Sequence, residues 1–149
     1  MLDIKFNHTL SIQLRFSDID KFGHVNNAAY FTYYDLGKTE YFSEAYPQVN
    51  WKKEGIVVAH INVDFFQPIF ASDSIAVQTA VTEIGEKSFQ LYQQVIDTQS
   101  YEVKCVCKST MVGFDLQKQQ SMPITEECKV SLCNFEGRDL RRKKPIQVI

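Results

Sequence analysis

The sequence predicts an α+β fold in which one long helix packs against an antiparallel sheet. Three observations support this prediction. Aromatic residues recur at helical spacing over residues 26–45, and strand-like segments dominate residues 56–114. The connections between the later strands are short, which forces neighbouring strands to run antiparallel. A list of elements of this kind is typical of a helix that covers one face of a sheet.

The first element is a strand, because Leu10, Ile12 and Leu14 alternate with polar residues. The pattern then changes to that of a helix over residues 26–45, which would be about 30 Å long. Asn26 or Asn27 is a suitable N-cap, and Pro47 and the residues after it end the helix. The aromatic side chains cover so broad an arc that they need a curved partner; they are Tyr30, Phe31, Tyr33, Tyr34, Tyr41 and Phe42.

Strands are expected for most of the chain after Gly55. Their predicted ranges are 56–64, 74–84, 89–97 and 102–114, and turn-forming residues occupy 71–73, 85–87 and 98–100. Residues 74–84 alternate as expected for a strand with one buried face. These strands would form the sheet against which the helix packs.

Composition favours a single domain over residues 1–149, with a core over about residues 8–125 and a basic tail over about 134–149. Of the 149 residues, 44% are apolar and 23% are charged, and a chain of this size buries roughly two thirds of its unfolded surface. The formal net charge of -2 creates no general attraction to nucleic acid or to an anionic membrane. We therefore expect neither as a partner.

The sequence shows no targeting segment and no apolar run long enough to span a membrane, so a cytoplasmic location is expected. Cys105 and Cys107 lie two apart on one strand face, whereas Cys128 and Cys133 fall in a less regular region. The C-x-C spacing has no matching pair of metal ligands. We expect buried free thiols, since reduced cysteine commonly packs as a small apolar residue.

Chemical groups concentrate in residues 15–27, between the first strand and the helix. A carboxylate just before a helix start lies beside free backbone N–H groups, which can stabilise developing negative charge. The segment resembles the signature of acyl-CoA thioesterases with the hotdog fold, a group that includes 4-hydroxybenzoyl-CoA thioesterase and the fatty acyl thioester hydrolases. The matching residues are Arg15, Phe16, Asp18, Asp20, Gly23, His24, Val25, Asn26, Asn27 and Tyr30, and further matches follow at Phe65, Pro68, Ile69, Asp73, Ser74 and Ile75. The resemblance implies an antiparallel sheet of five or six strands wrapped around one long central helix.

The same resemblance implies roles for individual residues. Asp20 would act as nucleophile or general base, and the backbone N–H of Asn27 would polarise the thioester carbonyl. His24 could orient water or bind substrate, because its ordinary pKa is close to neutrality. Each has an alternative: Asp20 could be a turn or capping residue, and His24 could be a packed residue. Asp18 is better suited to a structural hydrogen bond than to catalysis, because of its position two residues before Asp20.

One element of the fatty acyl pattern is missing. The plant fatty acyl branch carries an Asn that assists water activation two positions after the Asp, and Phe22 occupies that position here. In the aromatic branch, the position of His24 is apolar or aromatic. The chain is therefore nearer the fatty acyl form.

No cofactor is expected beyond the CoA thioester itself as substrate. His8 would be solvated near the start of the chain and His60 would lie in the second strand, so no two histidines have the spacing of metal ligands. A basic group near the end could contact CoA phosphates, but a solvated tail is the better interpretation; its residues are Arg138, Arg141, Arg142, Lys143 and Lys144.

These observations predict an acyl-CoA thioesterase that hydrolyses a fatty or aromatic acyl thioester, carried by CoA or by acyl carrier protein, to the free acid. Two alternatives remain open. A hydratase or dehydratase could use the same fold, although its Gly-Asp-x-Asn-Pro-x-x-His pattern is absent. A non-catalytic acyl-thioester-binding module could keep the pocket without turnover. A homodimer or homotetramer is expected, because a single sheet of this kind leaves edge strands without partners.

Overall fold

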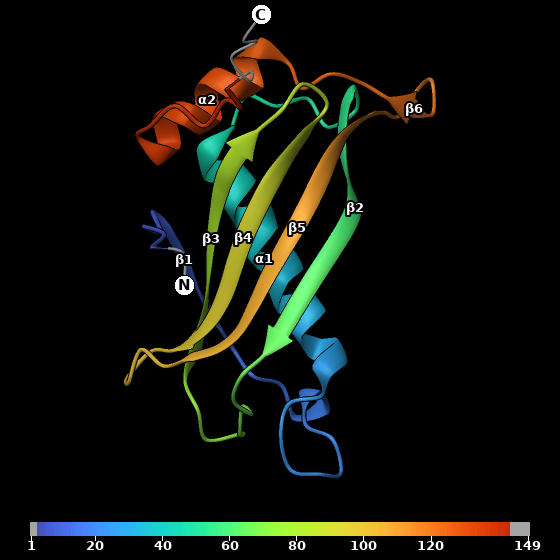
Figure 1. Cartoon of the computed structure of the whole chain (residues 1–149). Coiled ribbons are helices and arrows are strands. Elements are labelled where there is room, and N and C mark those ends of the chain that lie inside the picture. Colours follow the sequence, from blue (N-terminus) through green and yellow to red (C-terminus); the bar gives the residue numbers. More distant parts are fainter. Residues whose placement is uncertain (1–2, 144–149) are drawn as a thin grey trace, which may run out of the picture.

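In a computed structural model of the chain, residues 3–143 are described, and they form a six-stranded sheet with two helices (Figure 1). The elements in chain order are β1 (His8–Ile12), α1 (Asn27–Ala45), β2 (Glu54–Phe65), β3 (Ile75–Ile84), β4 (Ser88–Asp97), β5 (Val103–Asp115), β6 (Gln120–Ser121) and α2 (Glu126–Glu136). Strand order is β1-β3-β4-β5-β2, with β6 paired to β5, and every pairing is antiparallel. The α+β hotdog prediction is confirmed.

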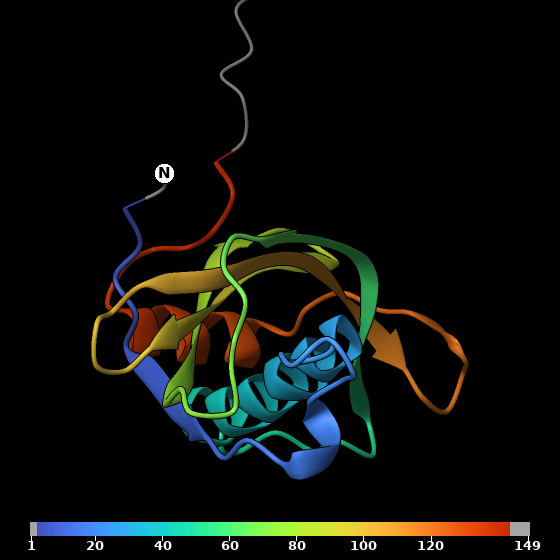
Figure 2. The same ribbon diagram turned by 90° about the horizontal axis from the view of Figure 1, so that it is seen from below.

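Helix α1 lies against the concave face of the curved sheet, which wraps around it (Figure 2). Tyr33, Tyr34 and Tyr41 are fully buried in this contact. The aromatic arc is narrower than predicted, because Phe31 is 41% exposed. Successive helical residues are turned by about 100°, so the side chain that follows the buried Tyr30 emerges beside the sheet.

The helix approaches the sheet closely at Gly37. A Cβ at this position would lie 2.2 Å from Cγ1 of Val77 on β3 and 3.1 Å from Nε2 of Gln93 on β4. The buried Gln93 side chain donates hydrogen bonds to the Tyr34 carbonyl oxygen at 2.9 Å and to Thr79 Oγ1 at 3.0 Å. Sheet and helix are therefore joined by a polar contact as well as by apolar packing.

The predicted N-cap is confirmed as Asn26, whose Oδ1 accepts from the Ala28 N–H at 3.0 Å. Its backbone is extended, with φ -61° and ψ 135°, as is usual for a capping residue. Asn27 is consequently the first residue of α1. The helix ends at Ala45, two residues before Pro47.

The ordered core continues beyond the boundary near residue 125 that the sequence predicts. Helix α2 follows directly, capped by Thr125, and Cys128 and Leu132 from its buried side join the core with Leu140. The segment after α2 pairs with the end of β3, because the Ile84 N–H donates to the Leu140 carbonyl oxygen at 2.8 Å. The expected irregular region is thus an amphipathic helix, since residues four apart share one helical face.

Two of the basic residues near the end of the chain form ion pairs with glutamates. Arg141 pairs with Glu126 and Arg142 pairs with Glu83, whereas Lys144 lies outside the described residues. Over residues 3–143, neither helix combines the length and apolar character needed to cross a membrane.

Candidate functional site

The segment between β1 and α1 folds into a compact loop at the start of the helix. Phe16–Asp18 forms one turn of 3-10 helix, and an isolated antiparallel bridge joins Ile19 to Val25. At the tip, Gly23 has φ +89°, in the left-handed region that glycine adopts without a steric penalty. The Asn26 N–H donates to the Asp18 carbonyl oxygen at 2.8 Å, so the loop returns to the helix start in a defined register.

Asp18 anchors this loop, as the sequence predicts. Its buried carboxylate accepts hydrogen bonds from Tyr33 Oη at 2.8 Å, from the Arg15 N–H at 3.0 Å and from the Arg15 guanidinium at 3.1 Å. Burial by itself would raise the pKa of Asp18, but the hydrogen bonds from Arg15 and Tyr33 outweigh it and lower the pKa below its ordinary value. An ionised Asp18 therefore links the loop to α1.

All three predicted site residues line one cleft beside the start of α1. The cleft has a volume of about 380 Å³. Its lining comes from the loop, from α1, and from the end of β2 with the residues after it: Asp20, His24, Val25, Asn27, Tyr30, Phe65, Phe66, Gln67 and Pro68. Two segments about 40 residues apart in the chain thus line one pocket.

Asp20 is partly buried in this cleft. Its Oδ1 accepts from the Phe22 N–H at 2.9 Å. One carboxylate oxygen of Asp20 therefore has the turn-stabilising role that the sequence offered as the alternative to catalysis. Over residues 3–143 no donor bonds to Oδ2. The second oxygen therefore remains able to accept a proton or to attack a carbon atom.

The backbone N–H of Asn27 has no acceptor within the described part of the chain. A first-turn N–H has no partner inside its own helix, and the Asn26 side chain serves the next N–H along, that of Ala28. A free donor at a helix start also carries the positive end of the helix dipole. This is a suitable place for an oxygen that gains negative charge.

Aromatic residues that were not predicted as site residues complete the cleft. Tyr30 packs edge-on against Phe65, with ring centroids 5.0 Å apart. Burial raises the pKa of Tyr30 to about 12, so its hydroxyl stays protonated at neutral pH. His24 lies near the rim, with its ring 6.3 Å from that of Phe70. Tyr30 and Phe65 both belong to the sequence motif, but the contact between them forms only because β2 ends beside the start of α1.

The predictions for the cysteines in β5 and for His60 are confirmed, and the prediction for His8 is wrong. Cys105 and Cys107 are buried free thiols, as predicted, and burial raises the pKa of both. His60 lies in β2, as predicted, and its side chain is exposed. The prediction of a solvated His8 is wrong: only 3% of this residue is exposed, because β1 turns its side chain onto α1 rather than toward water.

Comparison with known proteins places the molecule in a class, the hotdog-fold thioester hydrolases. A thioesterase from Thermus thermophilus, solved in complex with coenzyme A and Zn, superimposes with a TM-score of 0.79 at 28% identity, covering 89% of this chain and 96% of that one. A model of the thioesterase-like superfamily matches residues 14–132. The chain belongs to this superfamily.

Two relatives named as thioester hydrolases agree with that assignment, and a third is uncharacterized. The long-chain acyl-CoA thioesterase FadM of Escherichia coli is 24% identical over 123 residues, which cover 81% of this chain and 93% of FadM. The 1,4-dihydroxy-2-naphthoyl-CoA hydrolase of Crocosphaera subtropica is 31% identical over 55 residues, which cover 37% of this chain and 39% of that protein. The uncharacterized protein YsmA of Bacillus subtilis is 25% identical over 87 residues, 58% of this chain and 59% of YsmA.

Proposed function

We propose that this protein hydrolyses a fatty or aromatic acyl thioester of CoA, or of acyl carrier protein, to the free acid and the thiol. One observation carries the proposal. Asp20, with one carboxylate oxygen free of donors, and Asn27, with a backbone N–H free of acceptors, line the same cleft of about 380 Å³ within the described residues. The similarity to FadM, which is named for long-chain acyl-CoA, favours a fatty acyl group.

In the proposed reaction, Asp20 removes a proton from water while the water oxygen attacks the thioester carbonyl carbon. The carbonyl oxygen becomes negatively charged and accepts a hydrogen bond from the Asn27 N–H, with His24 nearby. The carbon–sulfur bond then breaks, and the departing thiolate takes the proton from Asp20. In the variant in which Asp20 is the nucleophile, its oxygen attacks the carbonyl carbon, the carbon–sulfur bond breaks and the thiolate leaves. Water then hydrolyses the mixed anhydride to the free acid, which restores the Asp20 carboxylate, and a proton from that water neutralises the thiolate. Neither route requires a metal or a redox cofactor.

The test is a thiol-release assay on a panel of acyl-CoA substrates with Asp20→Asn. We expect kcat to fall by about 10²- to 10⁴-fold, the range for loss of a general base, with little change in KM. Asp115→Asn is the matched control, because Oδ1 of Asp115 also accepts from the N–H two residues later, at 2.9 Å. Asp115 ends β5 and pairs with β6, which lies at the opposite end of the molecule from the loop that precedes α1 (Figure 1). An Asp20→Asn enzyme with unchanged turnover would remove Asp20 from the mechanism.

The same assay separates the alternatives. A binding module would retain acyl-CoA without releasing thiol, whereas a hydratase would change the acyl chain and leave the thioester intact. The wild-type protein is expected to release one thiol for each acid formed.

We further propose that the working form is a homodimer or homotetramer assembled through the outer edge of β2. Over the described residues this edge pairs with no strand, and Val57, Val58 and Ile61 along it are between 37% and 46% exposed. A long apolar strand edge is otherwise a liability for aggregation. Analytical ultracentrifugation would measure the state; a monomer at micromolar concentration would contradict the proposal. The expected cytoplasmic location stays a prediction.

A further inference from the structure

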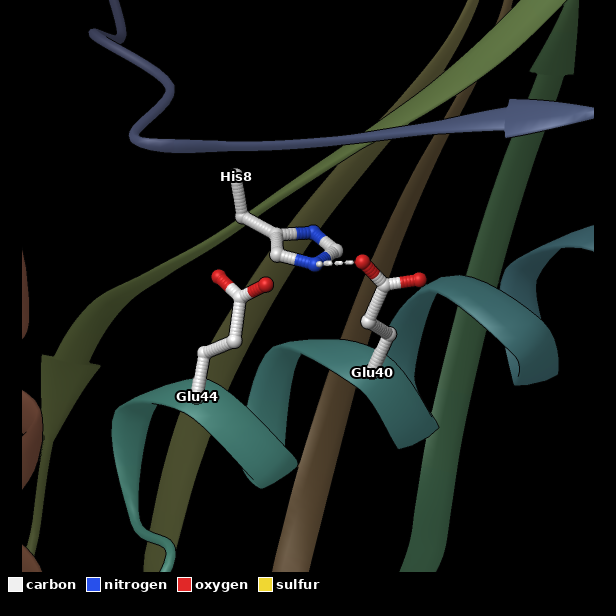
Figure 3. Close-up of side chains that lie close together, drawn as sticks. All are labelled: His8, Glu40 and Glu44. Atoms are coloured by element: carbon white, nitrogen blue, oxygen red, sulfur yellow. Dashed lines mark ion pairs between the residues drawn. The ribbon is translucent and has the colours of Figure 1, made fainter.

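The far half of α1 carries a second group of functional side chains, remote from the cleft. His8 from β1 faces Glu40 and Glu44, which lie four residues apart on α1 (Figure 3). Glu40 is 13 residues from Asn27, about 20 Å along the helix at its usual rise. Whatever this group does is therefore separate from chemistry at the helix start.

His8 is an unusual histidine for a simple packing role. Its side chain is 2% exposed, and neither ring nitrogen makes a hydrogen bond within the described part of the chain. The nearest charged atom is Glu40 Oε1, 3.5 Å from Nε2, which is too long and poorly directed to satisfy the nitrogen. Burying an unsatisfied polar atom is unfavourable, so the ring is missing a partner on the side that faces α1.

The two glutamates also favour a cation as the partner of the imidazole. Their carboxylates rise from α1 on either side of the imidazole (Figure 3), and ligand atoms of the three residues lie within 4.8 Å of one another. Like charges four residues apart on a helix repel each other. A cation between them would relieve this repulsion and give the imidazole nitrogen a partner.

We propose that His8, Glu40 and Glu44 bind a divalent transition-metal cation of the zinc type. Imidazole nitrogen suits Zn²⁺, whereas Mg²⁺ prefers oxygen ligands alone. Two ligands of a tetrahedral Zn²⁺ with bonds near 2.0 Å are about 3.3 Å apart, close to the 3.5 Å between His8 Nε2 and Glu40 Oε1. Glu44 is exposed, so its flexible side chain is able to move in as the third ligand, and water would complete the coordination.

The bound ion would act as a structural clamp. Strand β1 has only five residues and lies at the edge of the sheet, where it pairs with β3 alone among the described strands. Ligands from β1 and α1 on one ion would join this edge strand to the central helix. The sequence excluded a metal site because its histidines are scattered; the fold supplies the other ligands as glutamates.

Calorimetric titration of the purified chain with Zn²⁺ tests the proposal, with Mg²⁺ as the comparison ion. We expect one Zn²⁺ per chain, no Mg²⁺ binding, and a higher thermal midpoint with Zn²⁺ than with EDTA. Glu44→Gln, an exposed substitution that leaves the core intact, and His8→Gln should each weaken Zn²⁺ binding by more than the ~10- to 100-fold that loss of an outer-shell partner costs. Glu127→Gln, an exposed glutamate on α2, is the matched control and should bind as the wild type does.

Substitution with Co²⁺ identifies the donor atoms through its visible absorption. Nitrogen and oxygen ligands without a thiolate-to-metal charge-transfer band support the assignment. A thiolate band would place the ion on a cysteine and overturn it. Equal Zn²⁺ affinity in the wild type, His8→Gln and Glu44→Gln, or no Zn²⁺ binding by the folded wild type, would also overturn it.

Discussion

Replacing Asn27 with proline removes its backbone N–H from the cleft, together with its side-chain amide, while leaving the fold in place. Proline lacks the backbone N–H but is favoured as the first residue of a helix, because that N–H has no partner within the helix. Asn27 is the first residue of α1, and Asn26 before it is extended at φ -61° and ψ 135°, as a residue that precedes proline must be. The capping bond from the Ala28 N–H to Asn26 Oδ1 does not involve the substituted atom.

The expected effects on stability and on activity therefore differ. The free energy of unfolding should change by no more than about 1 kcal/mol, because proline restricts the unfolded chain at a compatible position. If the N–H stabilises the oxyanion, kcat should fall by about 10²- to 10³-fold, which corresponds to about 2.7–4 kcal/mol of transition-state stabilisation. Urea unfolding and thiol release from an acyl-CoA measure the two quantities on one preparation.

Asn27→Ala is the control, because it removes the side chain and keeps the N–H. Its kcat should remain within a few-fold of wild type. A folded Asn27→Pro protein with unchanged kcat would show that this N–H is not the oxyanion donor. Equal losses in the Ala and Pro variants would assign the effect to the side chain.

Two further predictions concern the support of the site. Gly37→Ala should lower the free energy of unfolding by about 1–3 kcal/mol, because its Cβ would lie 2.2 Å from Val77 Cγ1. This loss is expected even though Ala is the better helix former. A variant that is more stable than wild type in urea unfolding would refute this. Asp18→Asn should cost about 1–3 kcal/mol at neutral pH, because it weakens the bonds from Arg15 and Tyr33. The lowered pKa of Asp18 stabilises the fold above the ordinary pKa of 3.8, and this stabilisation is lost as pH falls from that value through the lowered pKa. The difference in stability between wild type and Asp18→Asn, followed by urea unfolding, should therefore shrink with acid. A difference that grows with acid would contradict the assignment.

Local patterns in the chain were enough to predict α1 and the long strands, and the resemblance over residues 15–27 supplied the catalytic candidates. The N-cap at Asn26, the end of α1 before Pro47 and the bonds from Arg15 to Asp18 depend on neighbours within a few residues. The bond from Tyr33 to Asp18 instead spans 15 residues. The short-range interactions are encoded by spacing alone. The same holds for the location of Asp20 and Asn27 in the chain, since both lie in the short segment that leads into the helix.

Contacts between distant segments could not be obtained in this way. Phe65 reaches Tyr30 only because β2 returns along the sheet to the start of α1, and His8 reaches Glu40 only because β1 packs on the other half of the same helix. Strand order β1-β3-β4-β5-β2 does not follow chain order, so no local spacing records these meetings. Burial is likewise a property of the packed molecule: a histidine at position 8 of the sequence is expected in water, and it is buried because β1 places its side chain against α1.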